Sequence, residues 1–196
     1  MKNRWVVLFA GILIQAILGG IYAWSVFVPP LMEGYELNRG QCGTIFGVCI
    51  AVFTVAMIGA GRLLAARGPR ITAGIGGGLF LVGYGTASLS GGNYPLLLLG
   101  IGLGVGAGIG FGYVCPLTVG MQWFPDKKGL ITGIAVAGFG GGAILLSSIA
   151  TSMLAGGMDV LRFFLWLGVI AGSVLILAAL LLAVPDTESH MKNVSR

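Results

Sequence analysis

Charge is scarce in this chain, and its absence is concentrated in five long windows. Lys, Arg, Asp and Glu make up 9% of the residues, against about 25% in soluble domains. Each window reaches the ~20 apolar residues that a helix needs to cross a bilayer. The uncharged windows are 5–32, 40–61, 71–125, 129–158 and 163–185. They exclude a soluble enzyme and indicate that the protein works inside a membrane.

Reactive and metal-ligating residues are sparse as well. Cys42, Cys49 and Cys115 form no CxxC or similar spacing, so we expect neither a disulfide framework nor a metal site. No Ser/His, Asp/Asp or metal-ligand set lies within the windows, which argues against an intramembrane enzyme and against a bound cofactor. Proton-driven carriers usually need an ionisable relay, and anion carriers a buried cation, and the windows supply neither.

The windows predict an all-α integral membrane protein with six transmembrane helices. The third window is long enough for two helices, and the Ser-Gly-Gly-Asn-Tyr-Pro run at 90–95 divides it. Residues 1–190 are then one transmembrane domain, ending in a polar cytoplasmic tail at 186–196. The expected spans are about 5–32, 41–65, 71–90, 95–119, 129–154 and 161–184.

Basic residues predict the orientation of these spans. With six spans, nine of the 11 basic residues share one side, and the other side holds Arg39 and Arg162. We therefore expect both termini in the cytoplasm and the chain in the inner membrane of the cell. The formal charge of +5 reports this orientation and requires no nucleic acid partner.

A weak internal repeat relates the second and fifth expected helices at an offset of 86 residues. Such a repeat fits a 3 + 3 arrangement in which the second unit is inverted, as in many alternating-access transporters. Apolar, glycine-rich segments match easily by chance, so the repeat alone is suggestive. The matches run from Gly43, Ile45, Gly47, Ala51, Phe53 and Ile58 to Gly129, Ile131, Gly133, Ala137, Phe139 and Ile144.

Glycine occupies every second position from 100 to 112. On a helix these glycines form two rows at i, i+4 spacing, which leave a groove that neighbouring helices can approach closely. Tight packing is one interpretation, and smooth contacts that let helices slide during transport are the other. The rows are Gly100, Gly104, Gly108 and Gly112, and beside them Gly102, Gly106 and Gly110.

Polar and aromatic residues mark one face of the first expected helix. Gln15 and Tyr22 lie seven residues apart, with Ser25 on the same face. A buried amide needs hydrogen-bond partners, so we expect this face to look inward onto a cavity. Gly110 and Tyr113 form a comparable face in the fourth helix. Packing between helices, or an aromatic belt at the membrane surface, is the alternative role for the tyrosines.

Three stretches resemble the oxalate/formate antiporter family, a branch of the major facilitator superfamily. Residues 20–27 resemble the YAWSxF segment of its first helix. Residues 123–129, continuing through 132–140, resemble the family's junction between helices 4 and 5. Residues 61–63 and 67–70 resemble the signature loop of the superfamily between helices 2 and 3.

The resemblance implies a secondary active transporter that moves small organic anions by alternating access. The signature loop normally carries an Asp at the place of Ala65, and Asp126 could substitute as the partner of Arg62 or Arg67. Members have twelve spans in two halves, and this chain resembles the N-terminal half, without the cationic residues of the other half. The implied cytoplasmic gate comprises Gly61, Arg62, Arg67, Gly68, Arg70, Asp126 and Lys127.

These observations leave several interpretations open. In the first, the chain is a half-size carrier that pairs with a second copy or a complementary six-helix half. A cavity without fixed charge would then suit small carboxylates or neutral solutes. In the second, the chain is an inactive or partner-dependent piece of a longer antiporter. A membrane scaffold or channel-like module without alternating access is a third interpretation, although no polar ring typical of a channel is visible.

Overall fold

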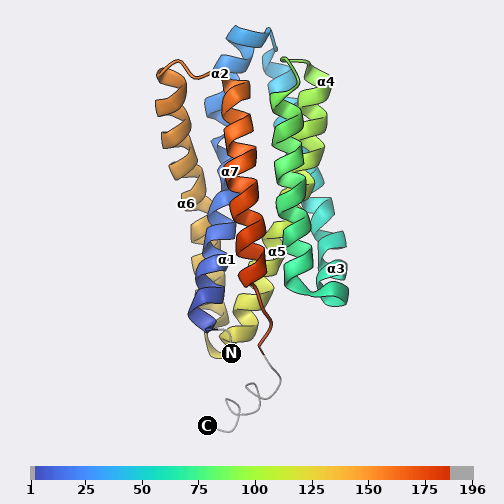
Figure 1. Ribbon diagram of the computed structural model, residues 1–196, viewed down its shortest axis with the longest axis vertical. Coiled ribbons are helices and arrows are strands. Elements are labelled where there is room, and N and C mark those ends of the chain that lie inside the picture. Colours follow the sequence, from blue (N-terminus) through green and yellow to red (C-terminus); the bar gives the residue numbers. More distant parts are fainter. Residues whose placement is uncertain (1–2, 186–196) are drawn as a thin grey trace.

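The computed structural model describes residues 3–185, and every regular element among them is a helix. The tail expected at 186–196 lies outside the described residues. The described helices form one elongated bundle (Figure 1). Five of them are long and apolar enough to span a membrane: Arg4–Tyr35, Arg39–Ser88, Tyr94–Trp123, Pro125–Ala155 and Val160–Leu181. An all-helical membrane protein was expected, and this part of the prediction is confirmed.

The first span is helical throughout but changes its pitch midway. Asn3 begins it, because its side-chain oxygen accepts a hydrogen bond from the backbone N–H of Trp5 at 3.0 Å. The span ends at Glu36, whose backbone has a positive φ of 58°. Its segments are α1 (Arg4–Gly19), the 3₁₀ turn η1 (Gly20–Ala23) and α2 (Trp24–Tyr35).

Helix α3 (Arg39–Ser88) is broken at Gly68. The φ and ψ of Gly68 are 79° and 174°, a conformation essentially restricted to glycine. Pro69 follows and has no backbone N–H to continue the helical ladder. We name residues 39–67 the first arm and residues 69–88 the second arm. The chain reverses direction between the two arms at the lower end of the bundle (Figure 1).

The rest of the chain forms three further spans joined by short connections. Asn93 begins the first of these by accepting a hydrogen bond from the N–H of Leu96. This span contains a wide π-helical stretch, which the sequence did not predict. Its segments are α4 (Tyr94–Leu97), η2 (Leu98–Val105) and α5 (Gly106–Trp123), followed by η3 (Pro125–Lys127), α6 (Lys128–Ala155) and α7 (Val160–Leu181).

One glycine row, formed by Gly102, Gly106 and Gly110, contacts the first arm. A Cβ atom on Gly106 would lie 2.6 Å from the carbonyl oxygen of Cys49. One on Gly110 would lie 2.6 Å from the Cβ of Ala56. Both distances are too short for real side chains, so the row lets the two backbones approach closely.

The second glycine row contacts the second arm over most of its length. A Cβ atom on Gly100 would lie 2.6 Å from the carbonyl oxygen of Gly83, and one on Gly108 would lie 2.8 Å from that of Gly76. Gly104 also approaches Gly83, whereas Gly112 contacts the Leu18 side chain of α1. The glycine-rich segment is therefore seated between the two arms of α3.

Helix α1 contacts α5, α6 and α7, and the second arm contacts α7. Where α1 crosses α6, neither Gly19 nor Gly142 has room for a Cβ atom, because each faces a backbone carbonyl of the other helix.

Near the start of α1, Trp123 donates a hydrogen bond from Nε1 to the carbonyl oxygen of Ala183 at 2.6 Å. Arg4 and Trp123 line one pocket. Both ends of the described chain therefore lie at the same end of the bundle (Figure 1).

Candidate functional site

Five aromatic rings from four segments meet on one side of the bundle. Phe139 of α6 is central, with its ring centroid 5.1 Å from that of Tyr113 and 5.7 Å from that of Tyr22. Phe53 lies 5.4 Å from Tyr113, and Phe46 lies 6.2 Å from Tyr22. Most pairs meet edge to face, the arrangement that aromatic rings prefer. We name these five residues the aromatic cluster.

The aromatic cluster is partly open to its surroundings. The side chain of Tyr22 is 51% exposed, and its described contacts are with the rings of Phe46 and Phe139. Tyr113 is half-buried, whereas Phe139 is buried. Tyr22 is therefore the most accessible tyrosine of the cluster, and a phenol hydroxyl can donate a hydrogen bond to a carboxylate or to water.

Gln15 lies behind the aromatic cluster, between α1 and α5. It is fully buried, and its Nε2 donates a hydrogen bond to the backbone carbonyl of Tyr113 at 3.3 Å. This bond fixes the orientation of the amide and leaves Oε1 buried without a partner among the described residues. Ser25 is exposed on α2. Gly110 is buried against the first arm.

The structure thus brings together only some of the residues that the sequence assigned to the cavity. Tyr22 and Tyr113 meet through Phe139, and Gln15 reaches only the backbone of Tyr113. Phe46, Phe53 and Phe139 were not expected in the cavity. The internal repeat already paired Phe53 with Phe139, and that pairing was the available signal. Nothing in the sequence distinguished Phe46 from an ordinary apolar residue.

The residues expected at the gate lie at the end of the bundle where α1 begins. Gly61, Arg62 and Arg67 are exposed, and Gly68 forms the break in α3. Arg70 donates a hydrogen bond from Nε to the carbonyl oxygen of Leu182 at 2.9 Å, which ties the second arm to the segment after α7.

Asp126 and Lys127 lie in η3, between α5 and α6. Both are exposed and line a pocket with Arg4. Within residues 3–185, no ion pair joins Asp126 to Arg62 or Arg67. The suggested replacement of the signature-loop Asp by Asp126 is therefore not seen as a direct contact.

The positions paired by the internal repeat have matching environments. Ile45 and Ile131 are both buried, at 0% and 3% exposure. Phe53 and Phe139 both belong to the aromatic cluster, with centroids 6.4 Å apart. The remaining pairs are open: Ile58 and Ile144 are 63% and 71% exposed, Ala51 and Ala137 are exposed, and a Cβ on Gly43, Gly47, Gly129 or Gly133 would meet nothing within 4 Å.

These open positions lie on two exposed helix surfaces, one on the first arm and one on α6, beside the aromatic cluster. In the most apolar window of α3, and likewise in that of the span containing α6, 22% of the residues are buried. The corresponding share is 56% in the spans Arg4–Tyr35 and Tyr94–Trp123. We name the surface formed by the open residues of the first arm and α6 the open face.

Comparisons with known proteins agree with one another. Residues 3–196 match the family model described as the Major Facilitator Superfamily. The oxalate:formate antiporter of Oxalobacter formigenes is 27% identical over 195 residues, covering 99% of this chain and 46% of that protein. Apicoplast pyruvate carrier 1 of Toxoplasma gondii is 27% identical over 195 residues, covering 78% of this chain and 36% of that protein. The uncharacterized MFS-type transporter YhjX of Escherichia coli (strain K12) is 29% identical, with coverage of 78% and 38%. The chain thus spans less than half the length of these relatives.

Proposed function

Because the chain belongs to the Major Facilitator Superfamily, we propose that it forms one six-helix half of a secondary transporter that moves small organic anions by alternating access. The family and its transporter relatives point to a transporter rather than an enzyme. The observation that carries the proposal is the position of the aromatic cluster beside the open face. A second half placed on that face would close a cavity around the exposed ring of Tyr22.

Six crossings arranged as an inverted 3 + 3 repeat are supported by three features. A straight helix as long as α3, with 50 residues, would measure about 75 Å, far more than the ~30 Å apolar core of a bilayer. The break at Gly68 makes two crossings the natural alternative. An even number of crossings agrees with both described ends lying at one end of the bundle. The matched environments of the repeat positions agree with the inversion.

The proposed partner of the open face is a second copy of the chain or a complementary six-helix half. Gly43, Gly47, Gly129 and Gly133 offer a surface without side chains, and small residues let membrane helices pack closely. The chain matches less than half of each relative, so more than half of each relative's length is available for a second six-helix half.

The proposed substrates are small carboxylates or neutral solutes. The named relatives are an oxalate:formate antiporter and a pyruvate carrier. The uncharged windows of this chain hold no cation to neutralise a dianion. Tyrosine hydroxyls can hold a single carboxylate, so formate or pyruvate suits one copy of the aromatic cluster better than oxalate. Oxalate would need cations from a complementary half.

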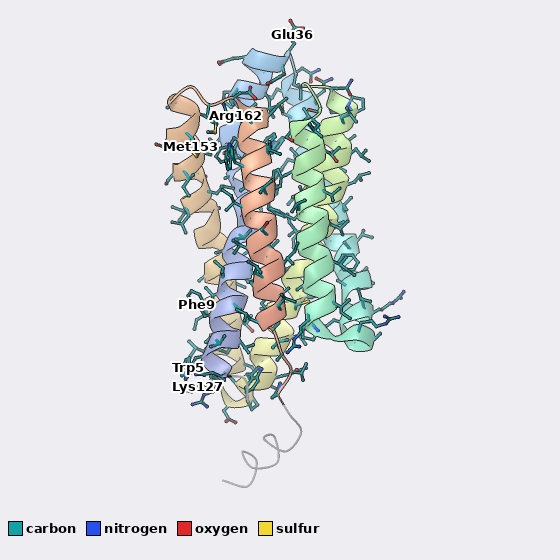
Figure 2. All side chains as sticks on the ribbon, in the orientation of Figure 1. Trp5, Phe9, Glu36, Lys127, Met153 and Arg162 are labelled. Carbon is teal, nitrogen blue, oxygen red and sulfur yellow. The ribbon has the colours of Figure 1, made fainter. Side chains whose placement is uncertain are left out.

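The proposed orientation places both termini in the cytoplasm and the chain in the inner membrane. With six crossings, nine of the 11 basic residues would lie on the cytoplasmic side, in agreement with the positive-inside rule. Figure 2 shows Lys127 and Trp5 at one end of the bundle, and Glu36 at the other, with Arg162 nearer to it. The Lys127 end would face the cytoplasm.

The proposal is tested by counterflow in vesicles containing the purified chain, together with its mass in mild detergent. We expect a mass near 40 kDa, twice the 20.1 kDa of one chain, and counterflow of formate, lactate or pyruvate. A monomer that exchanges none of these solutes would favour a partner-dependent piece or a scaffold. Voltage-driven single-channel current would favour a pore.

A further inference from the structure

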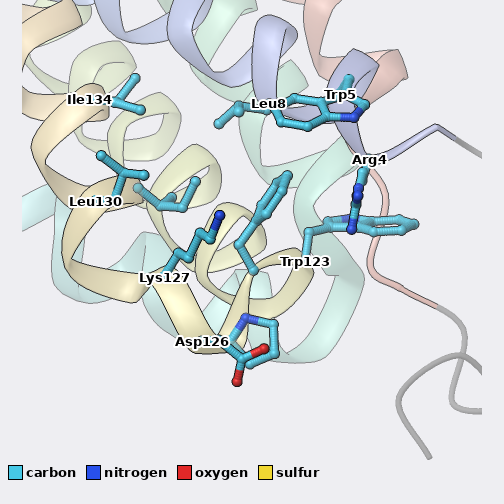
Figure 3. Close-up of a pocket in the computed structure, with 11 residues that line it drawn as sticks. Arg4, Trp5, Leu8, Trp123, Asp126, Lys127, Leu130 and Ile134 are labelled. Atoms are coloured by element: carbon cyan, nitrogen blue, oxygen red, sulfur yellow. The ribbon is translucent and has the colours of Figure 1, made fainter. Parts of the chain in front are cut away.

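A pocket of about 210 Å³ lies between the start of α1, the end of α5 and the start of α6 (Figure 3). Arg4 and Trp5 line it from α1, and Asp126 and Lys127 from η3. It belongs to the end of the bundle and not to the aromatic cluster, because the two share no residue. The remaining lining residues are Leu8, Trp123, Phe124, Pro125, Leu130, Ile131 and Ile134.

Two cationic side chains, those of Arg4 and Lys127, line the pocket, and neither forms an ion pair within the described residues. The guanidinium carbon of Arg4 lies 5.6 Å from the ring centroid of Trp5 and 5.7 Å from that of Phe124. Among the described residues the Arg4 guanidinium makes no hydrogen bond or ion pair, so its N–H groups are available to an anion. In Figure 3 the Lys127 ammonium points up toward the aromatic rings, and the Asp126 carboxylate points away from both cations.

The wall above the Arg4 and Lys127 side chains is apolar and partly exposed. Leu8, Leu130 and Ile134 continue the pocket along α1 and α6. Trp5 and Leu130 are each 58% exposed. Tryptophan is enriched where a membrane meets water, so in a bilayer this pocket would lie at headgroup level with its apolar wall toward the acyl chains. A free phosphate compound would use the cations but would gain nothing from this wall.

We propose that this pocket binds the headgroup of an anionic phospholipid. The lipid phosphate is held by the forked N–H groups of Arg4 and by the ammonium of Lys127, and the first acyl carbons pack on Leu130 and Ile134. Bound in this way, one lipid bridges the start of α1 to the start of α6. The inference rests on membrane placement and on the pocket, and it holds whichever solute the protein moves.

The test is native mass spectrometry of the detergent-solubilised chain, titrated with phosphatidylglycerol or phosphatidylcholine of the same acyl composition. We expect the first phosphatidylglycerol to bind at least several-fold more tightly than phosphatidylcholine. Arg4→Gln and Lys127→Gln should each lower phosphatidylglycerol affinity about fivefold, since a basic side chain near anionic lipid contributes about 1 kcal/mol. Phosphatidylcholine affinity should not change.

Lys128→Gln is the matched control, because Lys128 is the neighbouring exposed lysine and does not line the pocket. Its phosphatidylglycerol affinity should stay within twofold of the unmodified chain. Equal affinity for the two lipids, or equal losses in Lys127→Gln and Lys128→Gln, would overturn the proposal. Displacement of the lipid by equimolar inorganic phosphate would assign the pocket to a soluble phosphate instead. If Arg4→Gln does not fold, the two exposed lysine variants still decide the question.

Discussion

Among the described residues, several helix backbones approach each other closely at single glycines. A Cβ atom on Gly106 would meet the carbonyl oxygen of Cys49 at 2.6 Å, and that oxygen belongs to a helix that cannot yield locally. Gly78 is also helical, but a Cβ there would meet nothing within 4 Å. Glycine is therefore required by packing at one position and not at the other.

Gly106→Ala should destabilise the protein by about 1–3 kcal/mol, because the added methyl group forces α5 and the first arm apart. Gly78→Ala should be neutral or stabilising by up to about 1 kcal/mol, because alanine favours the helix. Thermal unfolding in detergent measures both. Equal melting temperatures for the two variants would contradict the close approach at Gly106.

Tyr22→Phe keeps the ring contacts with Phe46 and Phe139 and removes only the hydroxyl. If this hydroxyl holds a carboxylate, exchange should fall about tenfold or more, since a hydrogen bond to a charged group contributes about 1.5–3 kcal/mol. The melting temperature should not change, because the side chain is half exposed. Counterflow of formate measures the effect, with Tyr94→Phe as a remote control. Undiminished exchange would remove Tyr22 from the binding residues.

At the scale of elements, the break at Gly68 decides the course of α3. Gly68→Ala places a side chain in a conformation that costs about 1–3 kcal/mol, so we expect a lower melting temperature and poorer yield. Gly61→Ala, in the regular helix seven residues earlier, has nothing within 4 Å of its new methyl group and should tolerate the change. Equal behaviour of the two variants would mean that the hairpin does not depend on Gly68.

The sequence predicted the helices better than it predicted the site, and the first span shows why. Windows without charge indicate segments that lie in lipid, so the positions of the helices could be predicted without knowing any contact between them. A seven-residue spacing put Gln15 and Tyr22 on one face, but only for a regular helix. The 3₁₀ turn η1 advances about 120° per residue instead of 100° and changes that register. In the structure Gln15 is buried between α1 and α5, whereas Tyr22 is 51% exposed beside Phe46 and Phe139.

Local sequence patterns could not predict which distant helices contact one another. The glycine spacing indicated two rows in advance, but which arm each row contacts depends on the rotation of α5 and α3 in the bundle. The same holds for the rings that joined Tyr113, because Phe53 and Phe139 come from helices far apart in the sequence. The π-helical turns of η2 likewise have no sequence pattern that distinguishes them from an α-helix.

At the scale of the whole molecule, burial is uneven between the two sides of the bundle. The first arm buries only Cys42, Ile45, Cys49 and Ala60, whereas the second arm contacts both α5 and α7. Helix α6 contributes a second surface of this kind. The second half proposed above would cover both of these surfaces.

The double variant Gly47→Trp and Gly133→Trp should therefore separate a dimer. Two indole rings on the open face would prevent close helix contact, and the mass in detergent should fall from near 40 kDa toward the 20.1 kDa of one chain. Gly78→Trp introduces the same side chain on the second arm, where a Cβ meets nothing within 4 Å, and should leave the dimer intact. An unchanged mass for the double variant would place self-association elsewhere.

Both arms of α3 pack against the glycine rows, which come later in the chain, and this sets an order of assembly during synthesis. Both arms leave the ribosome before residues 100–112, which carry the glycine rows. At about 5–20 residues per second, the hairpin waits in the bilayer for roughly a second or more without its principal partner. During that interval the surfaces of α3 that later contact the glycine rows face lipid or the translocon.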